Sequence, residues 1–221
     1  MILIIDTSLS GIRLALGCLV GRLSTKVAYD MAGVVDTSPT CKYIQSEKQS
    51  LDLPPAVLEF LQANKISFRD LSAVAVVVGP GSFTGIRLGI AYAKGVALGA
   101  NIPLVGVNAF EIYLEQTPDA FVAIDSGKGD FFCAAKDMAP CIMTIDEIET
   151  KQMEYARTVG HKPYDLSNAI PIAARKLNRA QRDAPALAGG ADGEAVGGGF
   201  TDPVIPLYMK PSYAEQNCKS L

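Results

Sequence analysis

Short apolar runs separated by polar turns dominate the first part of the chain. Residues 2–5 form an apolar run that stops at Asp6, residues 12–17 alternate apolar and polar positions, and residues 22–29 can pair with them. Short turns between such runs predict an antiparallel meander of three strands. Residues 30–50 are polar and are predicted to be irregular.

Helical and strand patterns alternate from residue 52 onward. An apolar stripe formed by Val57, Leu58 and Leu61 follows two prolines, which predicts a helix that ends at Asn64. The later patterns predict a strand, a helix, a strand and a helix, at residues 73–78, 85–99, 103–107 and 109–116. Three strands followed by alternating helices and strands predict an α/β fold with a ribonuclease-H-like layer.

The opening of the chain recurs near its middle. The run Leu3-Ile4-Ile5-Asp6-Thr7-Ser8 is similar to Val122-Ala123-Ile124-Asp125-Ser126, and a glycine-containing turn and a second apolar run follow each. Chance can produce so short a repeat, but its place at the start of each half favours a duplicated domain. We therefore predict an N-terminal subdomain over residues 1–117 and a reduced C-terminal subdomain over residues 118–221.

The second half has a weaker pattern. Residues 146–156 and 170–181 are predicted to be helical. Residues 184–200 are rich in alanine and glycine, a composition that favours a flexible loop over a nucleotide-binding one.

Charge and cysteine content restrict the classes of partner and compartment. The formal net charge is −3 and the basic residues are scattered, which argues against strong nucleic-acid binding by this chain alone. The five cysteines form no C-x-x-C pair, and the first apolar run is too short for a signal peptide. We therefore expect a cytoplasmic protein without a membrane segment. The one histidine, His161, has no partner at metal-ligand spacing.

A glycine-rich turn lies between the predicted strand at 73–78 and the predicted helix at 85–99. A P-loop would require a lysine that is absent here, and the glycine spacing is one residue too long for a dinucleotide-binding motif. Ser82 and Thr84 can cap the helix that follows. Two interpretations remain open, namely anion binding by the turn and close packing of helix against strand.

The turn begins a longer motif, Gly79-Pro80-Gly81-Ser82-Phe83-Thr84-Gly85-Ile86-Arg87-Leu88-Gly89, which continues as Ala93-Lys94-Gly95-Val96-Ala97-Leu98 and Ile102-Pro103-Leu104-Val105-Gly106-Val107. This motif resembles the TsaB (YeaZ) family. The resemblance extends to Ile4-Ile5-Asp6-Thr7-Ser8, Ala123-Ile124-Asp125-Ser126 and Pro206-Leu207-Tyr208-Met209-Lys210. It implies a duplicated ribonuclease-H-like fold of the actin, Hsp70 and sugar-kinase superfamily. The family often has a His-Ser pair before its first helix, where this chain has Ser46-Glu47-Lys48-Gln49-Ser50.

The resemblance also implies a role in tRNA modification, in the formation of threonylcarbamoyladenosine. In such a complex TsaD holds the metal and transfers the threonylcarbamoyl group from an adenylate to N6 of the adenosine beside the anticodon, and the ATPase TsaE binds the TsaB–TsaD pair. This chain would be a non-catalytic scaffold without a cofactor of its own, with ATP or ADP and the metal ion on its partners. It would meet tRNA only through the complex.

The prediction of a binding partner rests on the predicted helix at 85–99. Gly85, Gly89 and Ala93 recur every four residues, and the helix is apolar around most of its circumference, so it is either fully internal or shared with a partner helix. By resemblance, TsaB proteins pair through this helix and the preceding one, as a homodimer or with TsaD. The predicted interface comprises Leu58, Leu61, Ile86, Arg87, Gly89, Ile90, Tyr92, Ala93 and Val96.

A second candidate site is a turn that faces phosphates and a metal ion in nucleotide-binding relatives. It comprises Asp6, Thr7, Ser8, Gly79, Gly81, Ser82, Thr84 and Gly85. In the alternative interpretation, Asp6 hydrogen-bonds its own backbone. A nuclease would need three or four clustered carboxylates, and only Asp6 and Asp125 stand at strand ends. A small-molecule kinase of the same superfamily and a metal-dependent, glycoprotease-like peptidase remain alternative functions.

Overall fold

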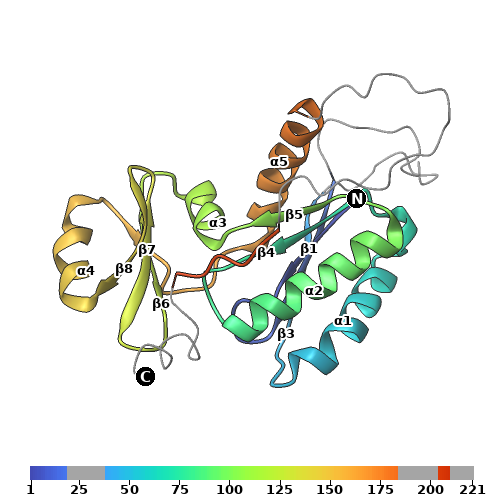
Figure 1. The fold of residues 1–221 in the computed structure, drawn as a ribbon, viewed down its shortest axis with the longest axis horizontal. Helices are drawn as coiled ribbons and strands as arrows, with labels where there is room; N and C mark the ends of the chain where they lie inside the picture. Colours follow the sequence, from blue (N-terminus) through green and yellow to red (C-terminus); the bar gives the residue numbers. More distant parts are fainter. Residues whose placement is uncertain (19–37, 184–203, 210–221) are drawn as a thin grey trace, which may run out of the picture.

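The computed structural model describes residues 1–18, 38–183 and 204–209, and these residues build two β-sheets (Figure 1). The first sheet has the order β3-β2-β1-β4-β5. Its strands are β1 (Ile2–Asp6), β2 (Ile12–Gly17), β3 (Thr40–Ile44), β4 (Ala73–Val77) and β5 (Leu104–Val107). The β1–β2 and β2–β3 pairs are antiparallel, whereas β4 runs parallel to β1 and β5 parallel to β4.

The second sheet repeats this arrangement without the fifth strand. Its order is β8-β7-β6-β9, and its strands are β6 (Phe121–Asp125), β7 (Asp130–Ala135), β8 (Met138–Thr144) and β9 (Thr158–Val159). The β6–β7 and β7–β8 pairs are antiparallel and the β6–β9 pair is parallel. The same order and directions occur in both sheets, which confirms the predicted duplicated ribonuclease-H-like fold with a reduced second half.

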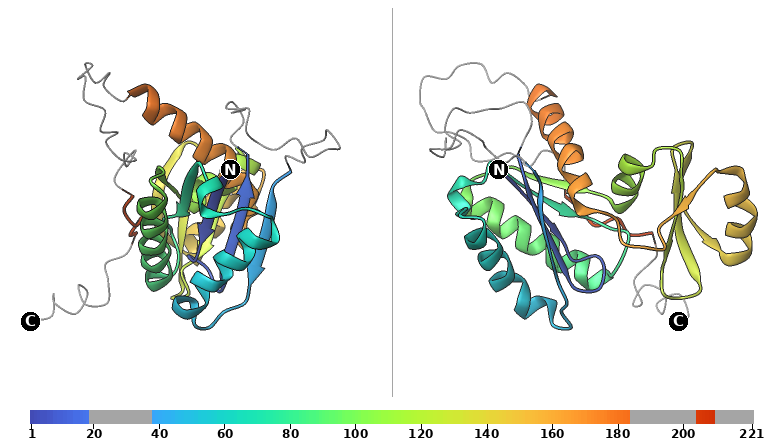
Figure 2. Two further views of the ribbon diagram at one scale, coloured as in Figure 1. Left: turned by 90° about the vertical axis from the view of Figure 1, so that its right-hand side faces the viewer. Right: turned by 180° about the vertical axis from the view of Figure 1, so that it is seen from behind.

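Helices cover both faces of the first sheet (Figures 1 and 2). The helices α1 (Gln49–Ala63) and α2 (Phe83–Ala100) lie side by side on one face, and α3 (Ala109–Gln116) and α5 (Ala169–Asp183) lie on the other. The helix α4 (Ile145–Lys151) packs against the second sheet. Short 3-10 turns occur at η1 (Phe68–Asp70), η2 (Gln152–Glu154) and η3 (Leu166–Asn168). In the described ranges, no helix is both long and apolar enough to cross a membrane.

The alternation of side chains along β1 shows how the core is divided. Leu3 and Ile5 pack under α1 and α2, whereas Ile2 and Ile4 point into a second cluster with α3 and α5. That second cluster also contains Val122 and other residues of the second sheet. The two sheets therefore share one central core. The division at residues 117 and 118 stays a prediction, and α5, which follows the second sheet in sequence, lies against the first.

Several predicted elements agree with the structure. The helix α3 has the predicted bounds, Asn64 is the C-cap of α1, and the Ser82 side chain caps α2 by accepting from the Gly85 amide at 3.2 Å. The predicted strand at 22–29 and the glycine-rich segment at 184–200 lie outside the described residues.

The prediction that residues 30–50 are irregular was wrong where the chain forms β3. Thr40–Ile44 pairs with β2 at the edge of the first sheet, and its residues are exposed or half-buried. An edge strand with little buried surface leaves no apolar alternation in the sequence, so the backbone pairing with β2 determines its structure. The helix α1 begins at Gln49, three residues before the predicted start.

Glycines allow the start of α2 to contact the turn after β1. A β-carbon at Gly85 would overlap the backbone oxygen of Thr7, and one at Gly89 would overlap the Thr7 hydroxyl. The Thr7 hydroxyl donates to the Gly85 oxygen at 2.6 Å. By contrast, a β-carbon at Gly95 would meet no atom within 4 Å. The glycines of one helix thus have different structural roles.

This difference predicts opposite effects of two matched substitutions. Gly85→Ala should lower the free energy of unfolding by at least about 2 kcal/mol, because the overlapping Thr7 atom belongs to the backbone and cannot rotate away. Gly95→Ala should raise the free energy of unfolding by about 0.5–1 kcal/mol, because alanine favours the helix. Urea denaturation of the two variants and the parent chain measures both effects. Equal effects of the two substitutions would contradict the packing described for Gly85.

Candidate functional site

Asp6, Thr7 and Ser8 form a buried turn at the end of β1. Their exposed fractions are 0%, 1% and 1%. The Asp6 carboxylate accepts hydrogen bonds from the Ser8 amide at 2.9 Å and from the Ser8 hydroxyl at 2.6 Å. This is the backbone-capping interpretation of Asp6, and it uses one of the two carboxylate oxygens.

The other carboxylate oxygen of Asp6 is bound by one residue of the neighbouring strand β2 and by one residue that is distant in sequence. Arg13 on β2 forms an ion pair with it at 3.1 Å, and the Tyr164 hydroxyl donates to it at 2.7 Å. The Arg13 guanidinium stacks on the Tyr164 ring at 4.4 Å and also donates to the Tyr164 backbone oxygen. The Asp6 charge is therefore compensated and hydrogen-bonded inside the protein, as a buried charge requires.

The glycine-rich turn packs directly on this Asp6 turn. The Ser82 amide donates to the Ser8 oxygen at 2.7 Å, and a β-carbon at Gly81 would overlap that same carbonyl group. Gly79 has a φ of +111°, a conformation that glycine adopts without strain. Thr84 lies exposed in the first turn of α2. Of the two interpretations of these glycines, the geometry favours close packing of backbone on backbone over anion binding.

The segment at residues 204–209 covers the glycine-rich turn from outside. The Leu207 amide donates to the Val78 oxygen at 2.7 Å. The Arg87 guanidinium lies 3.8 Å from the centre of the Phe83 ring and donates to the Tyr208 hydroxyl at 2.6 Å. The Pro-Leu-Tyr-Met part of the C-terminal motif thus packs on the first motif, whereas Lys210 lies outside the described residues.

Gln49, at the start of α1, is a structural residue that sequence reasoning missed. Its amide nitrogen donates to the backbone oxygens of Thr7, Leu9 and Gly11, at 3.4, 3.1 and 2.5 Å. These three bonds fix α1 to the β1–β2 turn. Gln49 lies in the segment where the TsaB (YeaZ) family often has a His-Ser pair. This difference from the family motif was the sequence signal that could have identified Gln49 as a structural residue.

The outer face of α1 and α2, the side turned away from the first sheet, is rich in apolar and small residues. Leu51, Leu58 and Leu98 are 68%, 47% and 66% exposed. Ala91 and Gly95 lie exposed on α2. We call these five residues the α1–α2 outer face.

A family model described as TsaD, tRNA N6-adenosine threonylcarbamoyltransferase, matches residues 43–181, more than half of the chain. The chain belongs to the TsaD family.

Within this family, curated relatives named tRNA threonylcarbamoyladenosine biosynthesis protein TsaB resemble the chain. The Escherichia coli protein is 48% identical over 54 residues, which is 24% of this chain and 23% of that protein. The Buchnera aphidicola (subsp. Schizaphis graminum) protein is 32% identical over 116 residues, which is 52% of this chain and 48% of that protein. The match thus spans less than half the length of either relative.

A solved structure described as YeaZ from Pseudomonas aeruginosa has the same fold. Its TM-score is 0.64, the alignment covers 94% of this chain and 98% of that one, and the sequence identity is 16%. The resemblance to TsaB (YeaZ) that the glycine motif suggested is therefore confirmed in sequence and in fold.

The structure of this TsaD-family chain corrects the predicted interface. Five of its nine residues lie in the core and pack toward the first sheet. Leu61, Ile86, Ile90 and Ala93 have exposed fractions of at most 5%. The fifth residue, Gly89, is buried beneath Thr7. Tyr92 and Val96 are half-buried, and Leu58 and Arg87 are exposed. The apolar character of α2 around its circumference did not reveal which side faces the sheet.

The structure divides the predicted phosphate-like turn between the interior and the surface, since Gly79 and Gly85 are buried with the Asp6 turn whereas Ser82 and Thr84 are exposed. Asp6, Thr7 and Ser8 are buried and their polar atoms bind protein groups, so an anion has no open approach to them. Asp125 is exposed on the second sheet, where it accepts from the Gly127 amide, so it forms no pair with Asp6. Within the part of the chain that the structure describes, no group of three or more His, Cys, Asp and Glu is placed to hold a metal ion.

The network around Asp6 predicts the effect of Tyr164→Phe. Removal of the hydroxyl leaves a buried carboxylate oxygen with one fewer donor, so the free energy of unfolding should fall by about 1–3 kcal/mol at pH 7. The control Tyr43→Phe, at a side chain that is 59% exposed, should change it by less than about 0.5 kcal/mol. Urea denaturation gives both values, and equal small changes would contradict the described role of Tyr164.

The network around Asp6 also predicts a pH dependence of stability, which the parent chain and Tyr164→Phe test. Burial, with the nearby Asp6 carboxylate, raises the pKa of Tyr164 well above its ordinary value. The unfolded chain loses this proton near pH 10, but the folded chain retains it, so the free energy of unfolding should fall as pH rises above about 10. The fall should be smaller in Tyr164→Phe, with a residual part from other groups whose pKa burial also raises, including Tyr92, Tyr113 and Cys133. Identical alkaline profiles for parent and variant would contradict this assignment.

Proposed function

We propose that this chain is a non-catalytic subunit in the formation of threonylcarbamoyladenosine on tRNA, and that it binds TsaD through the α1–α2 outer face. The observation that carries the proposal is the pair of adjacent helices with exposed apolar and small side chains on the side away from the sheet. Its closest support in the comparisons is the name TsaB of the curated relatives.

The geometry of the outer face suits helix-on-helix contact. Ala91 and Gly95 lie one helical turn apart on α2 and lack long side chains, so a partner backbone can come close. Leu98 continues the same side of α2, and Leu51 and Leu58 supply apolar area on α1. Exposed large apolar residues on adjacent helices are typical of protein–protein contacts. A second copy of this chain can use the same face, so pairing as a homodimer and pairing with TsaD compete in this proposal.

The Asp6 turn supports a scaffold rather than a kinase. A kinase of this superfamily needs this turn open to phosphate and metal. Here Arg13, Ser8 and Tyr164 bind both Asp6 carboxylate oxygens. No observation on the described residues favours the kinase or the peptidase. In the proposed complex, ATP or ADP and a metal ion therefore belong to the partner subunits TsaD and TsaE, and tRNA meets this chain only through the complex.

The proposal predicts that a charge on the outer face prevents pairing without unfolding the chain. Ala91→Glu should weaken binding to the TsaD of the same organism at least tenfold, because the interface would bury an unpaired carboxylate. The free energy of unfolding should change by less than about 0.5 kcal/mol, since Ala91 is exposed. Isothermal titration calorimetry measures binding, and urea denaturation measures stability.

A matched control places the same charge on another surface. Ile145 is 49% exposed on α4, which packs against the second sheet, so Ile145→Glu should leave TsaD binding unchanged. Unchanged binding by Ala91→Glu, or equal loss in both variants, would contradict the proposed interface.

A further inference from the structure

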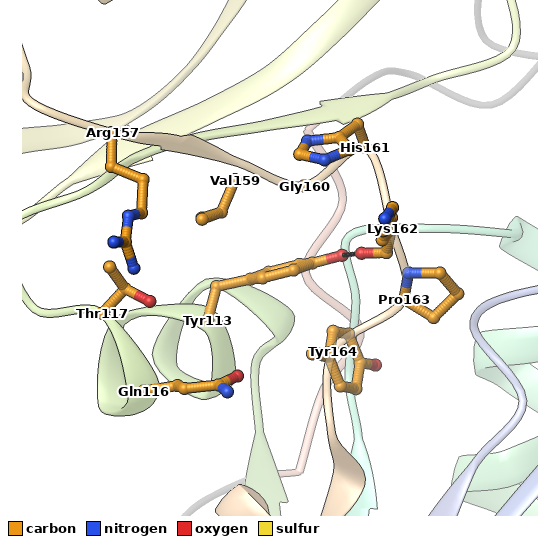
Figure 3. Close-up of a pocket in the computed structure, with 10 residues that line it drawn as sticks. All are labelled: Tyr113, Gln116, Thr117, Arg157, Val159, Gly160, His161, Lys162, Pro163 and Tyr164. Carbon is orange, nitrogen blue, oxygen red and sulfur yellow. Dashed lines mark hydrogen bonds between the residues drawn. The ribbon is translucent and has the colours of Figure 1, made fainter.

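A pocket of about 260 Å³ lies where the end of α3 meets the segment around β9. The polar groups of its lining belong to Tyr113, Gln116, Thr117, Arg157, His161 and Lys162 (Figure 3). The first three come from α3 and its C-cap, and the last three flank β9, so both halves of the chain build the pocket. It is separate from the α1–α2 outer face, and it borders the buried Asp6 turn through Tyr164, which lines the pocket and donates its hydroxyl to Asp6.

The pocket has a local excess of positive charge. The cationic residues Arg157 and Lys162 border it and are exposed, while its described lining contains no Asp or Glu. In the described ranges, neither Arg157 nor Lys162 forms an ion pair. The whole chain has a net charge of −3, so its average composition does not account for this cluster. Cationic side chains that no acidic group neutralises attract anions.

The framework of the pocket is fixed by contacts on both sides. The Tyr113 hydroxyl donates to the Lys162 backbone oxygen at 2.6 Å, and the Tyr113 ring meets the Tyr164 ring edge-on at 5.1 Å between centroids. Gly160 has a φ of +114°, and a β-carbon there would overlap the Ala123 backbone, so this segment lies close against β6. In Figure 3, Arg157 and His161 lie toward opposite ends of the Tyr113 side chain. A fixed framework reduces the ordering that a ligand must impose on binding.

We propose that this pocket binds a small anion that carries phosphate or carboxylate groups. The planar guanidinium of Arg157 matches the two oxygens of such a group, and the Thr117 hydroxyl and Gln116 amide add neutral donors. Lys162 supplies positive charge for a second anionic group, and the His161 ring can donate a hydrogen bond to it. The volume suits a small molecule rather than a polymer chain.

Titration of the isolated, isotopically labelled full chain tests the proposal. The probes are pyrophosphate and citrate, which distinguish phosphate from carboxylate recognition, and sodium chloride at matched ionic strength controls for screening. We expect saturable amide shifts in residues 157–164 and around Tyr113 with at least one probe. Shifts that sodium chloride reproduces, or no saturable shift with either probe, would overturn the proposal.

Two charge-removing variants and a matched control assign the site. Arg157→Gln and Lys162→Gln should each weaken binding of the active probe about tenfold, because each removes a charged donor. Both side chains are exposed, and unchanged spectra outside the pocket show that the variants fold. Lys136→Gln removes the same charge from the exposed β7–β8 turn and should bind like the parent chain. Parent-like binding by both pocket variants would exclude this site. The test needs no partner protein, so its result does not depend on the TsaD-binding proposal.

Discussion

The close contact between the Asp6–Ser8 turn and the start of α2 is the constraint on which the rest of this structure depends. Two backbone segments meet there with no side chain between them, and only glycine at positions 81 and 85 permits this. Hydrogen bonds from Ser82 to Ser8 and from Thr7 to Gly85 fix the contact. Because α2 is held this close to the sheet, the contact determines which side of the helix faces the core and which side faces solvent. Ile86, Ile90 and the neighbouring small residues face the core, and the opposite side remains exposed.

The buried charge of Asp6 has a second structural consequence. Its partners come from β2 and from residue 164, which follows the second sheet, so one ion pair and its hydrogen bonds join segments from both halves. The shared apolar core between the sheets supports the same junction. Arg13, Ser8 and Tyr164 bind both carboxylate oxygens of Asp6, so this turn is closed by the protein's own groups.

Local patterns predicted much of the fold, but they did not predict the parts whose structure depends on tertiary contacts. The apolar runs of β1 and β4 and the capped helix α3 were predictable, because both faces of a strand or one stripe of a helix are buried. The edge strand β3 was not, since its pairing with β2 leaves no apolar signal. The glycines of α2 indicated a close contact, but spacing alone could not show that its partner is Thr7 rather than another protein. Tyr164 was missed because 158 residues separate it from Asp6.

In the proposed function, this chain supports catalysis by a partner and performs none itself. The most direct test is threonylcarbamoyl transfer to tRNA by the TsaD and TsaE of the same organism, with the reaction supplied with the adenylate donor and measured with and without this chain. We expect transfer when all three proteins are present, little transfer when this chain is omitted, and none by this chain alone. Transfer by the isolated chain, or transfer that is equally fast without it, would show that the proposed supporting role is wrong.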